Sequence, residues 1–243
     1  MQINFDSIYK THSNSTLDWL PMDTKERYEK NLISNYEKLK DNNWIDNKFT
    51  YKFNSLGFRC DEFTNDPTIM FLGCSYTCGI GLPLETIWPE IVAKHFNMKS
   101  ANLGVGGGAP DTAFRYCLGY IDNIKPKAVV YLKPEGTRLE IAIDNEIIPI
   151  NVYSYKANDY NMLIRQFFKL WLIGEENNSY FNNEKNLLAM RHLCAIRNIP
   201  FIELDIKKMI TLDLARDLGH DGVKSHANFS RYAIEELEKI KNW

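Results

Sequence analysis

The sequence has 243 residues, of which 44% are hydrophobic and 13% aromatic, and its formal net charge at pH 7 is −2. Such a composition is typical of a globular protein, and it lacks the basic excess of proteins that bind nucleic acids or membrane surfaces. No apolar run approaches the roughly 20 residues that cross a bilayer. The N-terminus also lacks the basic start and apolar core of a signal peptide, so we expect a cytoplasmic protein without a nucleic-acid or membrane partner.

The five cysteines are an odd number in a chain with no secretory signal. A disulfide framework usually belongs to secreted proteins, so we expect reduced thiols that are mostly buried as small hydrophobic groups. They are Cys60, Cys74, Cys78, Cys117 and Cys194.

The first part of the chain predicts an amphipathic helix and then a strand. Apolar residues recur at helical spacing over 23–40, with Asp23 or Thr24 as the cap. Residues 49–53 alternate like a strand and lead into a turn. There is no internal repeat or low-complexity tract, so we expect an N-terminal helical extension over 1–48 and one domain over 49–243.

From residue 68 onward, buried strands alternate with helices. The predicted strands are 68–72, 99–103, 128–132 and 200–204. The predicted helices are 87–96 with Thr86 as N-cap, 111–123, 159–174, 182–197 and 228–241, with a hairpin inserted over 139–153. This alternation indicates a flavodoxin-like three-layer α/β sandwich, with a mostly parallel central sheet and helices on both faces.

Two glycine-rich stretches follow predicted strands, where parallel sheets bind their ligands. The first, residues 71–81 (FLGCSYTCGIG), contains Cys74 and Cys78, but their spacing fits neither a complete zinc site nor a C-x-x-C redox pair. It also has no lysine for a phosphate loop. A serine just past the strand end fits a nucleophile, with its own N–H available to an oxyanion; small residues that merely form a turn are the alternative. Ser75 is that serine.

A serine nucleophile needs a base and a group that orients the base. Asp217 and His220 are three residues apart, which lets the carboxylate reach the imidazole Nδ1. His226, with Asp221 as its partner, is the competing pair, although its place at the entry to the last helix fits capping or a surface contact better.

These segments resemble the motif blocks of the SGNH (GDSL-like) hydrolases over roughly residues 50–240. Residues 73–77 (Gly-Cys-Ser-Tyr-Thr) resemble the Gly-Asp-Ser block, residues 102–107 (Asn-Leu-Gly-Val-Gly-Gly) the second block, and residues 217–220 the final Asp-x-x-His. Residues 54–59 (Asn-Ser-Leu-Gly-Phe-Arg) look like a lead-in seen in many members.

The resemblance implies a serine esterase that needs no metal or other cofactor. Ser75 would be the nucleophile, His220 the general base and Asp217 its orienter, with the N–H groups of Ser75 and Gly107 in the oxyanion hole. The expected substrate is a small acyl ester, such as an acetyl group on a carbohydrate. Aromatic side chains of the segment 151–181 could line the sugar site or, at helical spacing, belong to the core.

The chain departs from the family pattern in two places. Cys74 replaces the aspartate of the first block, which is not a catalytic residue. Residues 133–138 (Lys-Pro-Glu-Gly-Thr-Arg) stand where the family has Gly-x-Asn-Asp, so the asparagine that gives the third oxyanion donor is missing from that place. Arg138 could replace it, could bind an anionic group of the substrate, or could be a solvated loop arginine.

Two other functions remain open. Residues 104–109 match G-x-G-x-x-A of dinucleotide-binding proteins, but after the second strand rather than the first and without the acidic residue that binds the ribose. A catalytically inactive SGNH-like module that binds a glycan or a protein would explain the missing asparagine. The oligomeric state is not predicted.

Overall fold

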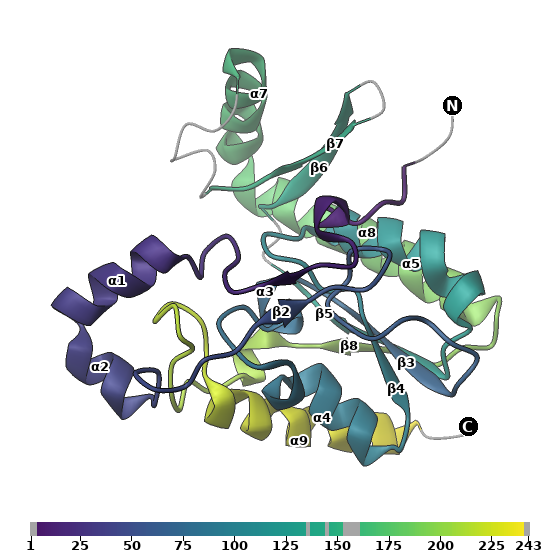
Figure 1. Cartoon of the computed structure of the whole chain (residues 1–243). Coiled ribbons are helices and arrows are strands. Elements are labelled where there is room, and N and C mark those ends of the chain that lie inside the picture. The colour runs from purple at the N-terminus through teal and green to yellow at the C-terminus, as the bar shows by residue number, and fades with distance from the viewer. Residues whose placement is uncertain (1–3, 135–136, 144–145, 153–160, 241–243) are drawn as a thin grey trace.

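Four strands form a parallel sheet in this computed structural model, which describes residues 4–134, 137–143, 146–152 and 161–240. The sheet has four strands in the order β4-β3-β5-β8, and every neighbouring pair is parallel. The strands are β3 (Thr68–Leu72), β4 (Lys99–Asn102), β5 (Ala128–Leu132) and β8 (Phe201–Leu204). The expected three-layer α/β sandwich is confirmed (Figure 1).

Two pairs of helices cover the two faces of this sheet. Helices α4 (Trp88–His95) and α9 (Val223–Lys239) pack together on one face, and α5 (Pro110–Ile124) and α8 (Glu175–Ala195) pack on the other. Side chains of one strand alternate between the two cores because successive residues point to opposite faces. Phe71 accordingly belongs to the core under α4 and α9, whereas Met70 belongs to the core under α5 and α8.

An antiparallel hairpin and a helix follow the middle strand. The hairpin consists of β6 (Leu139–Ile143) and β7 (Glu146–Ile150), and α7 (Met162–Ile173) stands beside it in Figure 1. The predicted insertion hairpin is thus confirmed over its described residues. Helix α8 begins at Glu175 rather than at 182, and the first two residues of the predicted helix 159–174 lie outside the described part of the chain.

The N-terminal helix predicted over 23–40 is broken in two. Thr24 caps α1 (Lys25–Ser34), and its side chain accepts a hydrogen bond from the Arg27 N–H. Asn35 then leaves the helical conformation, at φ −140°, before α2 (Tyr36–Asp41) begins. Asparagine side chains compete for local hydrogen bonds, and the Asn35 amide donates to Asn31 Oδ1 at 3.0 Å.

Other boundaries differ by a few residues. Thr86 is not the N-cap of α4: it ends a 3-10 helix (Leu84–Thr86), and Ile87 holds the cap position. The strand predicted over 49–53 is the short strand β2 (Tyr51–Lys52), which pairs antiparallel with β1 (Thr16–Leu17). Further 3-10 helices span Lys10–His12 and Ile206–Lys208, and a short helix, α3, spans Ser75–Cys78.

The last helix begins at Val223 rather than at 228, because a distant aspartate caps it. Asp213 accepts hydrogen bonds from the N–H groups of Lys224 and Ser225 at 2.9 and 3.0 Å. These are donors of the first turn that have no partner within a helix. Among the described residues, no helix is both long and apolar enough to cross a bilayer.

The N-terminal residues pack onto the body of the protein through a buried ion pair. Arg216 donates to Asp23 Oδ2 at 2.7 Å, and the two side chains are 5% and 1% exposed. The Tyr51 hydroxyl donates to the same carboxylate and accepts a hydrogen bond from the Gly81 N–H at 2.7 Å. This network joins four segments that lie far apart in the sequence. The domain boundary at residue 48 stays a prediction.

We predict that Asp23→Ala lowers the free energy of unfolding by about 3–5 kcal/mol, because it leaves the buried Arg216 guanidinium without its counter-ion. Urea unfolding followed by circular dichroism measures the change. Asp46→Ala, at an exposed position, serves as the matched control and should change stability by less than about 0.5 kcal/mol. A loss below about 1 kcal/mol for Asp23→Ala would show that the ion pair is not a structural support.

Candidate active site

The carboxyl end of β3 presents Ser75 at the start of the short helix α3. Its side chain is 2% exposed, and its carbonyl accepts hydrogen bonds from the N–H groups of Gly79 and Ile80. The chain turns sharply just before it, at Gly73. A Cβ there would lie 2.3 Å from Thr77 Oγ1 and 2.9 Å from the Leu132 carbonyl oxygen, so no side chain fits at this position.

Asp217 and His220 form a buried pair in the loop before α9. His220 Nδ1 lies 2.7 Å from Asp217 Oδ2, and Asp217 Oδ1 accepts the N–H groups of Gly219 and His220 at 3.1 and 3.0 Å. Burial acts to raise the pKa of Asp217, but the hydrogen bond and charge of His220, with the two N–H groups, outweigh it and lower the pKa. An ionised carboxylate at Nδ1 holds the ring so that Nε2 is the basic nitrogen.

The structure brings this loop against the serine segment. Arg216 N–H donates to the Gly81 carbonyl at 3.0 Å, and a Cβ at Gly81 would lie 3.3 Å from Asp217 Oδ1. The ring of Tyr76, the residue after Ser75, packs edge-on against the His220 ring with centroids 5.3 Å apart. The serine, histidine and aspartate expected from the sequence therefore lie in one region of the molecule.

The second glycine-rich stretch packs against the first. The Asn102 side chain donates to the Thr77 carbonyl at 2.9 Å and accepts the Gly104 N–H at 3.0 Å. A Cβ at Gly104 would lie 2.7 Å from the Cys78 nitrogen, so the two turns are in direct contact. Gly107 follows in the left-handed region, at φ +74°, which glycine adopts without strain.

Arg59 holds the turn at residues 78–82, which follows Ser75, by hydrogen bonds to its backbone carbonyls. Its guanidinium donates to the carbonyls of Cys78, Gly79 and Leu82, and it lies 4.5 Å from the centre of the Tyr51 ring. In the sequence this residue belongs only to the 54–59 lead-in, which predicts no role for it. The role is to satisfy three buried carbonyl groups of a turn that has no sheet or helix partner for them.

Residues of the N-terminal segment also reach both turns, which the sequence did not indicate. Tyr9 accepts the Gly106 N–H at 2.9 Å, and Arg27 Nη1 lies 3.7 Å from Asp217 Oδ2. Trp44 Nε1 donates to the Leu214 carbonyl at 2.7 Å. The loop that carries the aspartate and histidine is therefore held by side chains from the first 48 residues.

For two further candidates, His226 and Arg138, the structure excludes a position on the surface. His226 is buried, not on the surface: its Nδ1 accepts the Trp88 N–H at 3.2 Å, and burial lowers its pKa to about 3. It is thus a neutral core histidine. Arg138 is 7% exposed, so it is not a solvated loop arginine, and its carbonyl accepts the Asn182 amide at 3.2 Å.

The thiols are buried, whereas the described aromatic residues of the 151–181 segment divide between the core and the surface. All five cysteines are free and buried, as expected, and across the described ranges the His, Cys, Asp and Glu side chains form no group of three that could hold a metal ion. In the 151–181 segment Phe168 is buried in the core, whereas Phe167 and Tyr180 are exposed. Tyr153, Tyr155 and Tyr160 lie outside the described residues.

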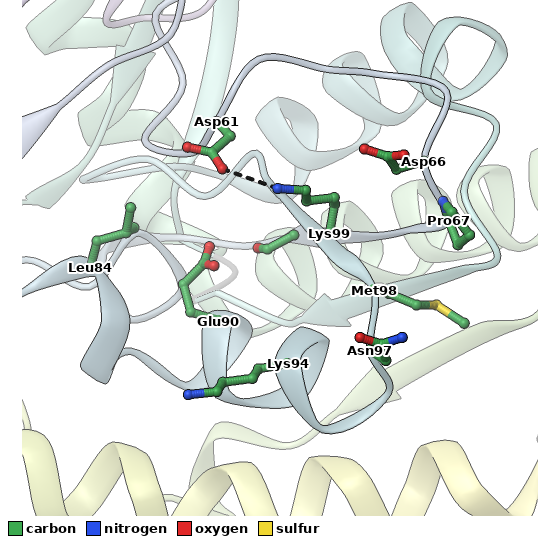
Figure 2. Close-up of a pocket in the computed structure, with 10 residues that line it drawn as sticks. Asp61, Asp66, Pro67, Leu84, Glu90, Lys94, Asn97, Met98 and Lys99 are labelled. Carbon is green, nitrogen blue, oxygen red and sulfur yellow. Dashed lines mark ion pairs between the residues drawn. The ribbon is translucent and has the colours of Figure 1, made fainter.

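A cavity of about 530 Å³ lies at the amino ends of β3 and β4 (Figure 2). Ser75, in contrast, follows the carboxyl end of β3. Pro67, Lys99 and Glu90 are among its lining residues, and Lys99 forms an ion pair with Asp61 at 3.6 Å. Burial raises the pKa of Glu90 to about 7. Ser75 and His220 are not among its lining residues, so we do not include this cavity in the candidate site.

The raised pKa of Glu90 predicts a dependence of stability on pH. A carboxyl group that is harder to ionise in the folded state stabilises the fold below its unfolded pKa, and this contribution is lost as the pH rises from about 4.5 through about 7. Glutamine has nearly the same shape as the protonated glutamate and does not ionise. Glu90→Gln should therefore remove the loss of stability with rising pH, and raise the free energy of unfolding at pH 8 by up to about 3 kcal/mol. Urea unfolding of both proteins from pH 4 to 8 tests this, and parallel pH curves would refute it.

Comparison with known proteins gives matches only among solved structures: no family model and no curated protein matches the chain. The psychrotrophic esterase EstA from Pseudoalteromonas sp. has 12% identity and a TM-score of 0.38, covering 73% of this chain and 100% of its own. The acetyl xylan esterase Est2A from Butyrivibrio proteoclasticus has 12% identity and a TM-score of 0.39, covering 73% and 65%. AlinE4, an SGNH-hydrolase family esterase, has 13% identity and a TM-score of 0.34, covering 74% and 82%. Esterases of the SGNH type that the motifs resemble are thus among the structures to which this chain is similar.

Proposed function

We propose that the protein is a serine esterase that hydrolyses a small acyl ester with Ser75, His220 and Asp217. The observation that carries the proposal is the buried Asp217–His220 pair at 2.7 Å, packed against the residue that follows a strand-end serine. A histidine whose Nδ1 is held by an ionised carboxylate is the base that a serine nucleophile requires.

The proposed hydrolysis uses these three residues in two steps, acylation of the serine and release of the acyl group. His220 Nε2 takes the proton of the Ser75 hydroxyl while the oxygen attacks the ester carbonyl carbon, and the carbonyl oxygen becomes an oxyanion. The N–H groups of Ser75 and Gly107 are the expected donors to it. His220 then protonates the leaving alcohol as the tetrahedral intermediate collapses. The same histidine then deprotonates a water molecule that attacks the acyl-enzyme carbonyl. When this second intermediate collapses, the bond to Ser75 Oγ breaks, His220 returns the proton to that oxygen, and the acid leaves.

The crowding around the serine favours a small acyl group. Ser75 is 2% exposed, and the neighbouring turns are built from glycines whose Cβ positions are already occupied, such as Gly73 and Gly104. Acetyl is the smallest acyl group after formyl. Acetylated carbohydrates are the substrates to screen first. One of the similar structures, Est2A, is named as an acetyl xylan esterase and so as an enzyme for this class of substrate.

We expect a fluorophosphonate probe to form one adduct, on Ser75, because the probe reports an activated serine without knowledge of the substrate. Intact mass and peptide mapping locate the adduct. Ser75→Ala should abolish it, and His220→Ala should slow labelling by about 10³-fold or more.

Two controls make this result specific. Ser230→Ala removes another buried serine, in α9, and His192→Ala removes an exposed histidine in α8; neither should change the labelling. A folded wild-type protein that takes no adduct would contradict the esterase and favour a binding module that has lost catalysis.

A further inference from the structure

The glycine-rich turn after β4 leaves one side of Gly107 facing a side-chain amide. A Cβ built on Gly107 would meet one described atom within 4 Å, the Nδ2 of Asn151, at 3.5 Å. Gly107 lies in a turn that touches the serine segment: the Val105 N–H points at the Gly73 carbonyl, and a Cβ at Gly108 would lie 3.0 Å from the same oxygen. An amide at Gly107 is therefore near the place where the oxyanion is expected.

Asn151 is held there by the hairpin. It directly follows β7, whose last residue, Ile150, is fully buried and pairs with Leu139. Beside that pair, Glu140 accepts hydrogen bonds from Thr112 and Arg115 of α5 at 2.7 and 2.8 Å. Helix α5 begins at Pro110, immediately after the glycine turn, so the same helix fixes both Gly107 and the end of the hairpin.

The other asparagine at this edge, Asn102, holds the two glycine-rich turns together. The amide nitrogen of Asn102 donates to the Thr77 carbonyl, and its oxygen accepts the Gly104 N–H, so both ends of that side chain build the turns. Arg138 lies one position beyond the Leu139–Ile150 pair and thus across the hairpin from Asn151. Arg138 is therefore the alternative to Asn151 as a hydrogen-bond donor to the oxyanion.

We propose that the side-chain amide of Asn151 is the third donor of the oxyanion hole, beside the N–H groups of Ser75 and Gly107. The inference rests on the proposed esterase function. Asn151 Nδ2 donates a hydrogen bond to the oxyanion of each tetrahedral intermediate and takes no part in bond breaking or proton transfer. The donor missing after the middle strand is therefore supplied from the far end of the inserted hairpin.

The test compares Asn151→Ala, Asn151→Asp and Arg138→Leu with the wild type on p-nitrophenyl acetate. Loss of one oxyanion donor lowers kcat by about 10²–10³-fold. We expect this loss for both Asn151 variants, with KM changed by less than about threefold. Asn151→Asp keeps the shape of the side chain, removes the donor and places a negative charge beside the oxyanion, so it should lose at least as much kcat as Asn151→Ala. Asn177→Ala, an exposed asparagine of α8, is the matched control and should leave kcat unchanged.

A second readout separates a donor from a structural residue. Phenylboronic acid forms a tetrahedral adduct with an active serine, so its inhibition constant should rise in the Asn151 variants in parallel with the loss of kcat/KM, while urea unfolding shows that they remain folded. An active wild type with unchanged kcat in the Asn151 variants, or with the loss in Arg138→Leu alone, would overturn the inference and leave the esterase standing. A folded wild type with neither esterase activity nor a fluorophosphonate adduct would instead overturn the proposed function, and the inference with it.

Discussion

The buried contact between Asp23 and Arg216 fixes the position of the loop that carries Asp217 and His220. Arg216 gives its guanidinium to the aspartate and its backbone N–H to Gly81, while its cation lies 4.0 Å from the centres of the Trp19 and Phe49 rings. Removing an arginine from water is costly unless such partners compensate it. The compensation comes from the N-terminal segment, so that segment and the loop are placed together.

A parallel sheet explains why the candidate residues can meet at all. The carboxyl ends of parallel strands lie at one edge, so the turns after β3 and β4 are neighbours although the strands are separated by a helix in the sequence. The glycines allow these turns to approach until backbone touches backbone, as at Gly104 and Cys78. Polar carbonyls exposed by such tight turns need donors, and Arg59 and Asn102 supply them.

The inserted hairpin adds to this edge without extending the sheet. Its ion pair, between Glu140 and Arg115, is almost fully buried, with 6% and 7% exposure, and ties the hairpin to the helix that follows the second glycine turn. The proposed role of Asn151 needs a rigid anchor, because a hydrogen-bond donor displaced by an ångström loses much of its effect on catalysis. The ion pair is that anchor.

The sequence by itself determined the elements whose signals are local. The strands 68–72 and 128–132 are uniformly apolar runs, and the Asp217–His220 spacing puts a carboxylate beside an imidazole within one turn. Only the tertiary structure decided what depends on distant partners. Asp213 starts α9 early, Asp23 pairs with a residue 193 positions away, and Asn151 reaches Gly107. Periodicity reports which face of an element is buried, whereas such contacts arise only when the packed elements bring remote polar groups together.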